Sequence, residues 1–239
     1  MKRLLKNIFK LASGLFLAFI FHSLLWVTFY KFAPVTFTPH MVFRFWEWAT
    51  EGEPHGINLR WRSYGSVSPN LIKAVTASED ARFLNHGGID WKAVDEARKY
   101  NLRHKGRKKR GASTITMQTA KNAFLTHNRT YIRKAFEVYF SYLMEAIWGK
   151  KRILEVYVNI VEWGKGVYGA EEASRKYFGK SADKLSKREA ALLAAVLPNP
   201  IRWSPARPTN YISRRASTIM ARMNAVEIPK IEKSKKKKK

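Results

Sequence analysis

The chain has 239 residues, no cysteine and a formal net charge of +27, from 45 Lys and Arg against 18 Asp and Glu. Hydrophobic residues make up 46% of it and aromatic residues 13%, which is too much for a disordered basic chain and predicts a folded core. The absence of cysteine excludes a disulfide framework and cysteine nucleophiles, while the mean hydropathy of -0.36 excludes a polytopic membrane protein and allows a single span.

Residues 11–30 contain no formally charged side chain, and a helix of about 20 apolar residues crosses the hydrocarbon layer of a membrane. This run predicts a transmembrane anchor that is retained, because no small-residue cleavage site follows it. The preceding residues 1–10 form a basic end with Lys2, Arg3, Lys6 and Lys10. The positive-inside rule therefore predicts a cytoplasmic N-terminus and places the rest of the chain outside.

Residues 31–65 are predicted to form an aromatic-rich connector. The stretch 32–48 is dense in aromatic side chains and is interrupted by Pro34 and Pro39, which favours a segment at the level of the lipid headgroups over a regular helix. A strand packed on the following domain is the alternative, and the sequence does not separate the two.

Residues 66–225 are predicted to form one mainly α-helical domain, because helix signals recur and strand alternation is almost absent. Ser68 and Pro69 indicate a helix start. Further helices are predicted over 111–125, with Ser113 or Thr114 as the cap, and over 133–148, 151–161 and 169–178. A capping box of Ser186 and Glu189 starts another helix, which Pro198 ends.

Positive charge is concentrated in residues 1–10, in the run 103–110 and in the tail from residue 230, within a basic disordered segment predicted over 226–239. With the domain outside the cell, these runs favour anionic lipid headgroups or a polyanionic wall polymer, and nucleic acid is excluded as a partner. We expect the run 103–110 to recruit anionic headgroups.

Glu79 is the first candidate for chemistry. It follows Ile72 and Val75 at helical spacing, so its carboxylate continues an apolar stripe. Partial removal from water suits a carboxylate that must accept a proton as a general base. The alternative is a plain helix end with two acids and a solvated histidine.

Two further polar stripes lie on predicted helices. Thr114, Gln118, Lys121 and Asn122 share one helix face that could hold a sugar or a phosphate, or could simply face solvent. A later helix carries Lys151, Arg152, Glu155 and Asn159, which either hold a second buried carboxylate or form an exposed ion-paired stripe. The six histidines show no metal-ligand spacing, and no P-loop or nucleophile elbow occurs.

Five motifs in order resemble those of family 51 glycosyltransferases. They are EDARFLNHGGID at 79–90, GASTITMQTAKNAFL at 111–125, RKAFEVYFSYLMEAIWGKKRILEVYVNIVEWG at 133–164, GVYGAEEASRKYFGK at 166–180 and LSKREAALLAAVLPNP at 185–200. Met117, Gly149 and Ser174 depart from the usual Gln, Ser and Ala of the family. None of these departures removes a carboxylate or a cation.

The resemblance implies a lysozyme-like helical catalytic domain on the outer face of the bacterial inner membrane that polymerises lipid II. Glu79 would be the general base that takes the proton of the GlcNAc 4-hydroxyl, whose oxygen attacks MurNAc C1 with inversion. Glu155 would assist the departure of undecaprenyl pyrophosphate, directly or by orienting a divalent cation such as Mg or Mn. The implied substrate-binding residues are Asp80, Phe83, His86, Ser113, Thr114, Gln118, Lys121, Asn122, Arg129, Arg133, Arg152 and Asn159.

The implied partners are lipid II, the growing glycan chain and membrane lipids, and cell-division or elongation proteins that the sequence does not identify. Two alternative functions stay open on the residues alone. One is a lysozyme-like hydrolase or lytic transglycosylase, and the other is a membrane-tethered wall-binding protein without turnover.

Overall fold

The computed structural model describes residues 1–52, 55–104, 110–126 and 130–230. The predictions for the basic run fall largely on residues 105–109, and those for the Lys tail on 231–239, outside the described residues. The chain divides into two compact units, Met1–Pro34 and Val35–Lys239.

The first unit is the helix α1, Lys2–Phe32. Its most apolar 18-residue window has a mean hydropathy of 1.9, so its length and composition suffice to cross a membrane. The predicted apolar N-terminal helix is confirmed, and it fits a single-pass anchor.

The second unit opens with the helix α2, Pro39–Thr50, where the sequence analysis predicted no regular helix. That prediction was wrong because Pro39 lies in the first turn, where a missing N–H costs nothing. The side chain of Thr38 accepts a hydrogen bond from a first-turn amide and caps the helix. Trp48 is buried, whereas Trp46 on the opposite face is 62% exposed.

The predicted mainly helical domain is confirmed, with the caps in place. Ser68, Thr114 and Ser186 cap their helices, and Glu189 completes the capping box. The sequence signals did not single out α4 and α10, and within α4 only Ala97 is buried. The helices are α3 Pro69–Glu79, α4 Trp91–Arg103, α5 Ile115–Phe124, α6 Tyr131–Ile147, α7 Gly149–Ile160, α8 Ala170–Phe178, α9 Lys187–Val196 and α10 Asn210–Arg222, and the 3-10 turns are Tyr64–Ser66, Phe83–Asn85 and Ala182–Lys184.

A small sheet accompanies the helices, in the order β1-β3-β2. β1 Asn58–Leu59 runs parallel to β3 Val167–Tyr168, and β2 Glu162–Gly164 runs antiparallel to β3. Strands of two or three residues are too short to show alternation in the sequence, which is why none was predicted.

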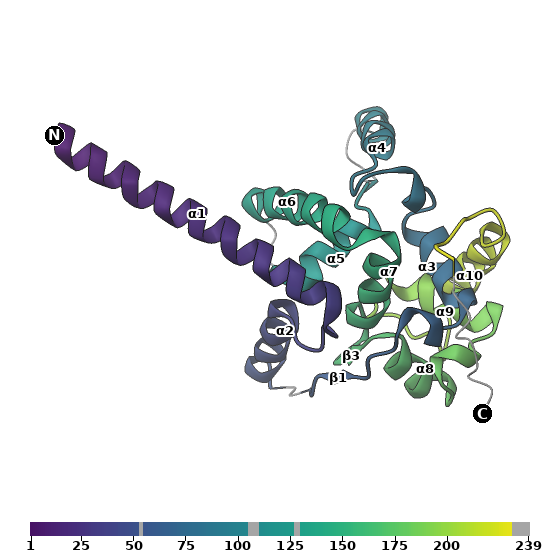
Figure 1. The fold of residues 1–239 in the computed structure, drawn as a ribbon. Helices are drawn as coiled ribbons and strands as arrows, with labels where there is room; N and C mark the ends of the chain where they lie inside the picture. Colours follow the sequence, from purple (N-terminus) through teal and green to yellow (C-terminus); the bar gives the residue numbers. More distant parts are fainter. Residues whose placement is uncertain (53–54, 105–109, 127–129, 231–239) are drawn as a thin grey trace, which may run out of the picture. The chain divides into compact units, whose positions relative to one another are not determined.

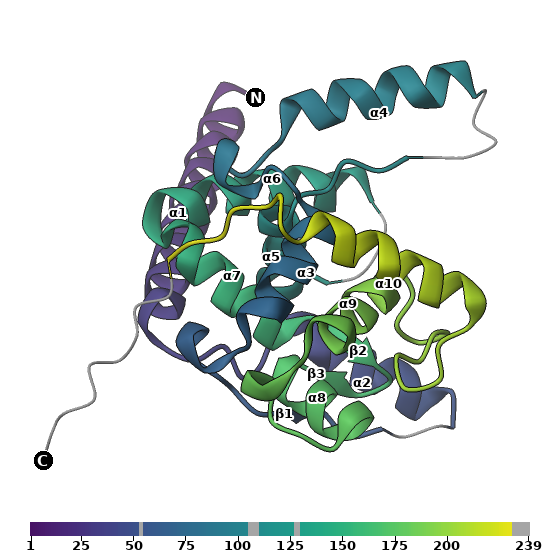
Figure 2. The same ribbon diagram turned by 90° about the vertical axis from the view of Figure 1, so that its right-hand side faces the viewer.

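The core forms around α3, α5, α7 and α9. The helix α9 is buried along most of its length and lies between α3 and α10, while α5 contacts α2, α6 and α7 (Figures 1 and 2). This arrangement places the C-terminal end of α3, where Glu79 lies, next to both α5 and α10.

Glu171 of α8 joins this helix to two other segments of the chain. Its side chain is fully buried and accepts hydrogen bonds from Arg62 at 2.8 Å, Arg175 at 2.6 Å, Ser181 at 3.1 Å and the amide of Ala182 at 2.9 Å. Burial alone would raise the pKa of Glu171, but these hydrogen bonds lower it to about 2. A carboxyl with a depressed pKa stabilises the fold above its unfolded pKa, and this stability is lost as the pH falls through its folded pKa.

We therefore expect Glu171→Gln to lower the free energy of unfolding at pH 7 by about 3 kcal/mol, because the variant loses the buried carboxylate whose hydrogen bonds lower its pKa to about 2. The loss of stability between about pH 4.3 and pH 2 should become shallower in the variant. Denaturant titrations across this range measure both effects. Glu172→Gln is the matched control, since Glu172 pairs with the exposed Arg60. Equal effects from the two variants would contradict the assignment.

Gly169, which precedes α8, cannot carry a side chain without strain. Its φ is +81°, and a Cβ would lie 2.6 Å from the backbone oxygen of Asn159. Gly169→Ala should reduce the free energy of unfolding by more than about 1 kcal/mol in a denaturant titration. Gly52→Ala separates the two causes, because Gly52 has a φ of +76° but open space around it. If both variants lose the same stability, the close contact contributes nothing.

Candidate active site

Glu79 is the last residue of α3, and its side chain is 14% exposed. Ser78 donates a hydrogen bond to Oε1 at 2.9 Å, and Gln118 of α5 donates one to Oε2 at 3.0 Å. The guanidinium of Arg215 on α10 lies 3.8 Å from Oε1. Three elements therefore hold a mostly buried carboxylate in one orientation while leaving part of it accessible.

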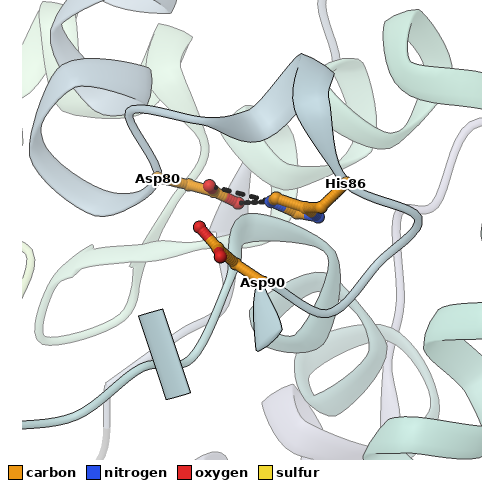
Figure 3. Close-up of side chains that lie close together, drawn as sticks. All are labelled: Asp80, His86 and Asp90. Atoms are coloured by element: carbon orange, nitrogen blue, oxygen red, sulfur yellow. Dashed lines mark hydrogen bonds and ion pairs between the residues drawn. The ribbon is translucent and has the colours of Figure 1, made fainter. Parts of the chain in front are cut away.

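The residues that follow Glu79 support it from behind. Asp80 accepts hydrogen bonds from Nε2 of His86 at 3.0 and 3.1 Å and from the amide of Ile115 at 3.1 Å (Figure 3). These bonds fix the start of α5 against the end of α3. Phe83 is buried beneath the ammonium group of Lys150, which lies 4.4 Å from the ring centroid. Of the predicted substrate residues, Asp80 lines the same cavity as Glu79, whereas Phe83 and His86 do not line it.

Asp80, His86 and Asp90 are grouped closely enough to be tested as a metal site, since their ligand atoms lie within 4.8 Å of one another (Figure 3). Arg82, however, pairs with both oxygens of Asp90, at 2.7 and 3.2 Å. Burial alone would raise the pKa of Asp90, but hydrogen bonds from Arg82 and Ala93 lower it. Because the guanidinium of Arg82 already pairs with both oxygens of Asp90, the three residues do not fit a divalent cation.

Two cavities flank Glu79 and the residue bonded to it. Glu79 lines a cavity of about 410 Å³ together with Ser113 and Thr114. Gln118 lines a second cavity of about 300 Å³, whose other predicted substrate residues are Lys121, Asn122 and Arg133. The structure thus gathers the second-motif residues on both sides of the Glu79–Gln118 hydrogen bond. The hydroxyl of Thr114 is committed to capping α5 and to the carbonyl of Gly88.

Glu137 on α6 is a buried acid that the sequence analysis did not single out. It is 4% exposed, forms an ion pair with Arg133, and accepts a bond from Lys134 at 2.8 Å. Lys134 also donates to Ser113 at 3.2 Å, and its pKa is lowered by burial and by the nearby charges of Arg133 and Lys121. A signal existed in the sequence, because a glutamate on a heavily apolar helix follows two cations by one turn.

Glu155, Arg152 and Asn159 make contacts in another part of the domain. Glu155 accepts a hydrogen bond from the amide of Tyr64 at 2.8 Å and pairs with Arg152. Asn159 is fully buried and exchanges two bonds with the backbone of Arg62, at 2.8 and 2.7 Å. None of the three lines either cavity described above. The predicted substrate residue Arg129 lies outside the described residues.

Comparisons with known proteins identify the family of the chain. The sequence model of a family described as Transglycosylase matches residues 49–224. The chain is 54% identical over 197 residues to the biosynthetic peptidoglycan transglycosylase of Rhodospirillum centenum, covering 82% of each chain. It is 44% identical over 225 residues to that of Caulobacter vibrioides, covering 94% of this chain and 93% of the relative. The chain therefore belongs to the transglycosylase family, a family of glycosyltransferases.

Proposed function

We propose that this protein is a peptidoglycan glycosyltransferase that polymerises lipid II into β-1,4 glycan strands, with inversion at MurNAc C1 and release of undecaprenyl pyrophosphate. One observation carries the proposal. Glu79, a mostly buried carboxylate, lines one cavity and is hydrogen-bonded to Gln118, which lines a second cavity with the cations Lys121 and Arg133. A base that lines one cavity, next to a second cavity lined by cations, suits attack by a hydroxyl on a phosphate-activated sugar.

In the proposed reaction the acceptor GlcNAc occupies the cavity beside Glu79. The carboxylate of Glu79 takes the proton of the 4-hydroxyl as its oxygen forms the bond to MurNAc C1. The C1–oxygen bond to the pyrophosphate breaks, and its electron pair leaves with the phosphate. Lys121 and Arg133 stabilise the charge that builds up there, and Gln118 holds the base in place.

In this proposal a second acid assists the departure of the pyrophosphate, and the chain offers two candidates. Glu155 follows from the family resemblance, but its carboxylate is bonded to Arg152 and to the backbone of Tyr64. Glu137 instead holds Arg133, which lines the cationic cavity, and Lys134, which reaches Ser113. The contacts favour Glu137 as the residue that orients the phosphate-binding cations, and favour a structural role for Glu155.

The proposed reaction also accounts for the anchor. The substrate carries a polyprenyl chain that stays in the bilayer, so the catalytic unit must work close to the membrane surface. We therefore propose a single-pass protein of the bacterial inner membrane, with a cytoplasmic N-terminus and the catalytic unit on the periplasmic side. The charge before residue 11 supports this orientation. Lipid II and the growing glycan chain are the proposed substrates.

Purified full-length protein with labelled lipid II tests the function directly. We expect a lysozyme-sensitive polymer, and we expect Glu79→Gln to reduce turnover by about a hundredfold or more, because no base remains to take the proton. Glu137→Gln should reduce turnover by about a hundredfold, while Glu155→Gln should chiefly lower the melting temperature. Release of soluble fragments from cell wall without any polymer would point to a hydrolase. If Glu155→Gln reduced turnover about a hundredfold and Glu137→Gln chiefly lowered the melting temperature, Glu155 would be the acid that assists the leaving group.

The pairing of Arg82 with Asp90 leads to a prediction about metal ions. Millimolar Mg²⁺ or Mn²⁺ should leave the melting temperature of the substrate-free protein unchanged. Arg82→Gln frees the carboxylate of Asp90 beside Asp80, so the same ions should raise the melting temperature of this variant. Arg60→Gln, at an exposed arginine, controls for a general charge effect. A comparable rise in the unaltered protein would show that Arg82 does not fill the site.

A further inference from the structure

One wall of the cationic cavity is formed by α2 and β2. Its α2 residues lie outside the five motifs, and only its β2 residue lies within one of them. The helix α2 contributes His40 and Arg44, and the strand β2 contributes Glu162, opposite Lys121 and Arg133 of α5 and α6. The catalytic residues inferred from the sequence account for the α5 and α6 side only. The α2 side therefore needs an explanation of its own.

Arg44 is held in place over this cavity. Its side chain is 17% exposed, and its guanidinium carbon lies 4.8 Å from the ring centroid of Trp48. It pairs with Glu47 through Nη1, and its Nε lies 3.5 Å from Oε2 of Glu162. Within the described part of the chain, Nη2 donates no hydrogen bond. A planar guanidinium with a donor still to be satisfied suits a phosphate oxygen.

Glu162 is the acid on the same wall, and its position is costly for a carboxylate. Its side chain is 11% exposed, and Oε1 is buried without a hydrogen-bond partner. Apart from Arg44, it receives a backbone bond from Gly166 and faces the acid Glu47 and the phenols of Tyr168 and Tyr177. Such an arrangement leaves the negative charge of Glu162 poorly compensated.

The charges around the cavity add up to an anion site. Arg44, Lys121 and Arg133 line it, and among the described residues Glu162 is the only acid that does. Building on the proposed function, we propose that Arg44 of α2 is a further pyrophosphate-binding residue of this site, and that Glu162 positions Arg44 over the cavity. The helix α2 then forms part of the binding site for the leaving group.

The protonation of Glu162 gives this arrangement a pH dependence. Burial raises the pKa of Glu162 to about 7, against the opposing effects of Arg44 and of the amide of Gly166. Above this pH the carboxylate of Glu162 is negatively charged, so it competes with a phosphate for Arg44 and repels the phosphate. Below this pH the neutral carboxyl no longer competes. Anion binding and protonation of Glu162 therefore favour each other, and replacing Glu162 by a neutral isostere should remove the coupling.

The test measures binding of inorganic pyrophosphate to the full chain in detergent micelles by calorimetry. Arg44→Gln should weaken binding about tenfold at pH 7, which corresponds to about 1.4 kcal/mol. Arg60→Gln is the matched control, because Arg60 is 63% exposed, pairs with Glu172 and does not line the cavity. An affinity of Arg44→Gln equal to that of the control would overturn the proposal.

Glu162→Gln tests the role of Glu162 through the pH dependence of pyrophosphate affinity, which a purely structural role would not change. The ratio of its affinity to that of the unaltered protein cancels the titration of pyrophosphate itself. This ratio should rise as the pH increases from about 6 to 8, and a flat ratio would overturn the role of Glu162. If Arg44→Gln melts far below the control, Arg44→Lys takes its place. We expect it to bind several-fold more weakly, because an ammonium group lacks the planar fork, and unchanged binding would overturn the role of Arg44.

The outcome can be separated from that of the proposed function. A protein that polymerises lipid II while Arg44→Gln binds pyrophosphate normally would refute only the inference about α2. A protein that makes no polymer while Arg44→Gln and Glu162→Gln change pyrophosphate affinity as expected would refute only the reaction. The anion site and its dependence on α2 would then stand on the binding data.

Discussion

The hydrogen bond from Gln118 to Glu79 joins the end of α3 to the middle of α5, and the rest of the site is arranged around this join. Asp80, the next residue, binds the first amide of α5 and so fixes the direction in which that helix leaves. Because α5 carries Lys121 and Asn122 one turn beyond Gln118, the same contact that orients Glu79, the proposed base, also sets its distance from the cationic cavity. The proposed base Glu79 and the cation Lys121 therefore lie on two helices that are joined directly, an arrangement that would limit reorganisation during the proposed reaction.

Buried acids hold the cations in this domain. Glu137 pairs with Arg133, Glu162 with Arg44, and Glu171 with Arg62. A buried ion pair contributes little net stability, because desolvation offsets the attraction, but it does define where a long flexible side chain lies. The acids differ in how completely they are satisfied. Glu171 has four donors and a strongly lowered pKa, whereas Glu162 keeps an oxygen without a partner and its pKa is raised. An acid whose oxygens all have hydrogen-bond donors, such as Glu171, has a structural role. The acid with an oxygen that lacks a donor, Glu162, lines the cavity.

Local signals predicted the helices well and the tertiary contacts poorly. The caps at Ser68, Thr114 and Ser186 were readable because each depends on residues within one turn. The helix α2 was missed because its prolines looked like breaks, although one of them lies in a first turn. Glu79 and Gln118 were both predicted to be functional, but their contact spans 39 positions, and no local pattern encodes it. The same limit explains why the sequence analysis singled out Glu155 and not Glu137. Both acids follow two cations by three and four residues, and they differ only in the residues that the fold packs against them.

Oε1 of Glu162 is buried without a hydrogen-bond partner, and this lowers the stability of the fold at the edge of the cavity. A buried acceptor without a donor costs about 1–3 kcal/mol, a sizeable share of the stability of a domain. A purely structural clamp between α2 and β2 would gain stability from a neutral side chain at this position, because Arg44 already has Glu47 as a partner. An acid becomes useful only if its negative charge must hold the guanidinium over the cavity and then yield it to a stronger anion. The cost in stability is thus located where a charged leaving group would have to be bound and then released.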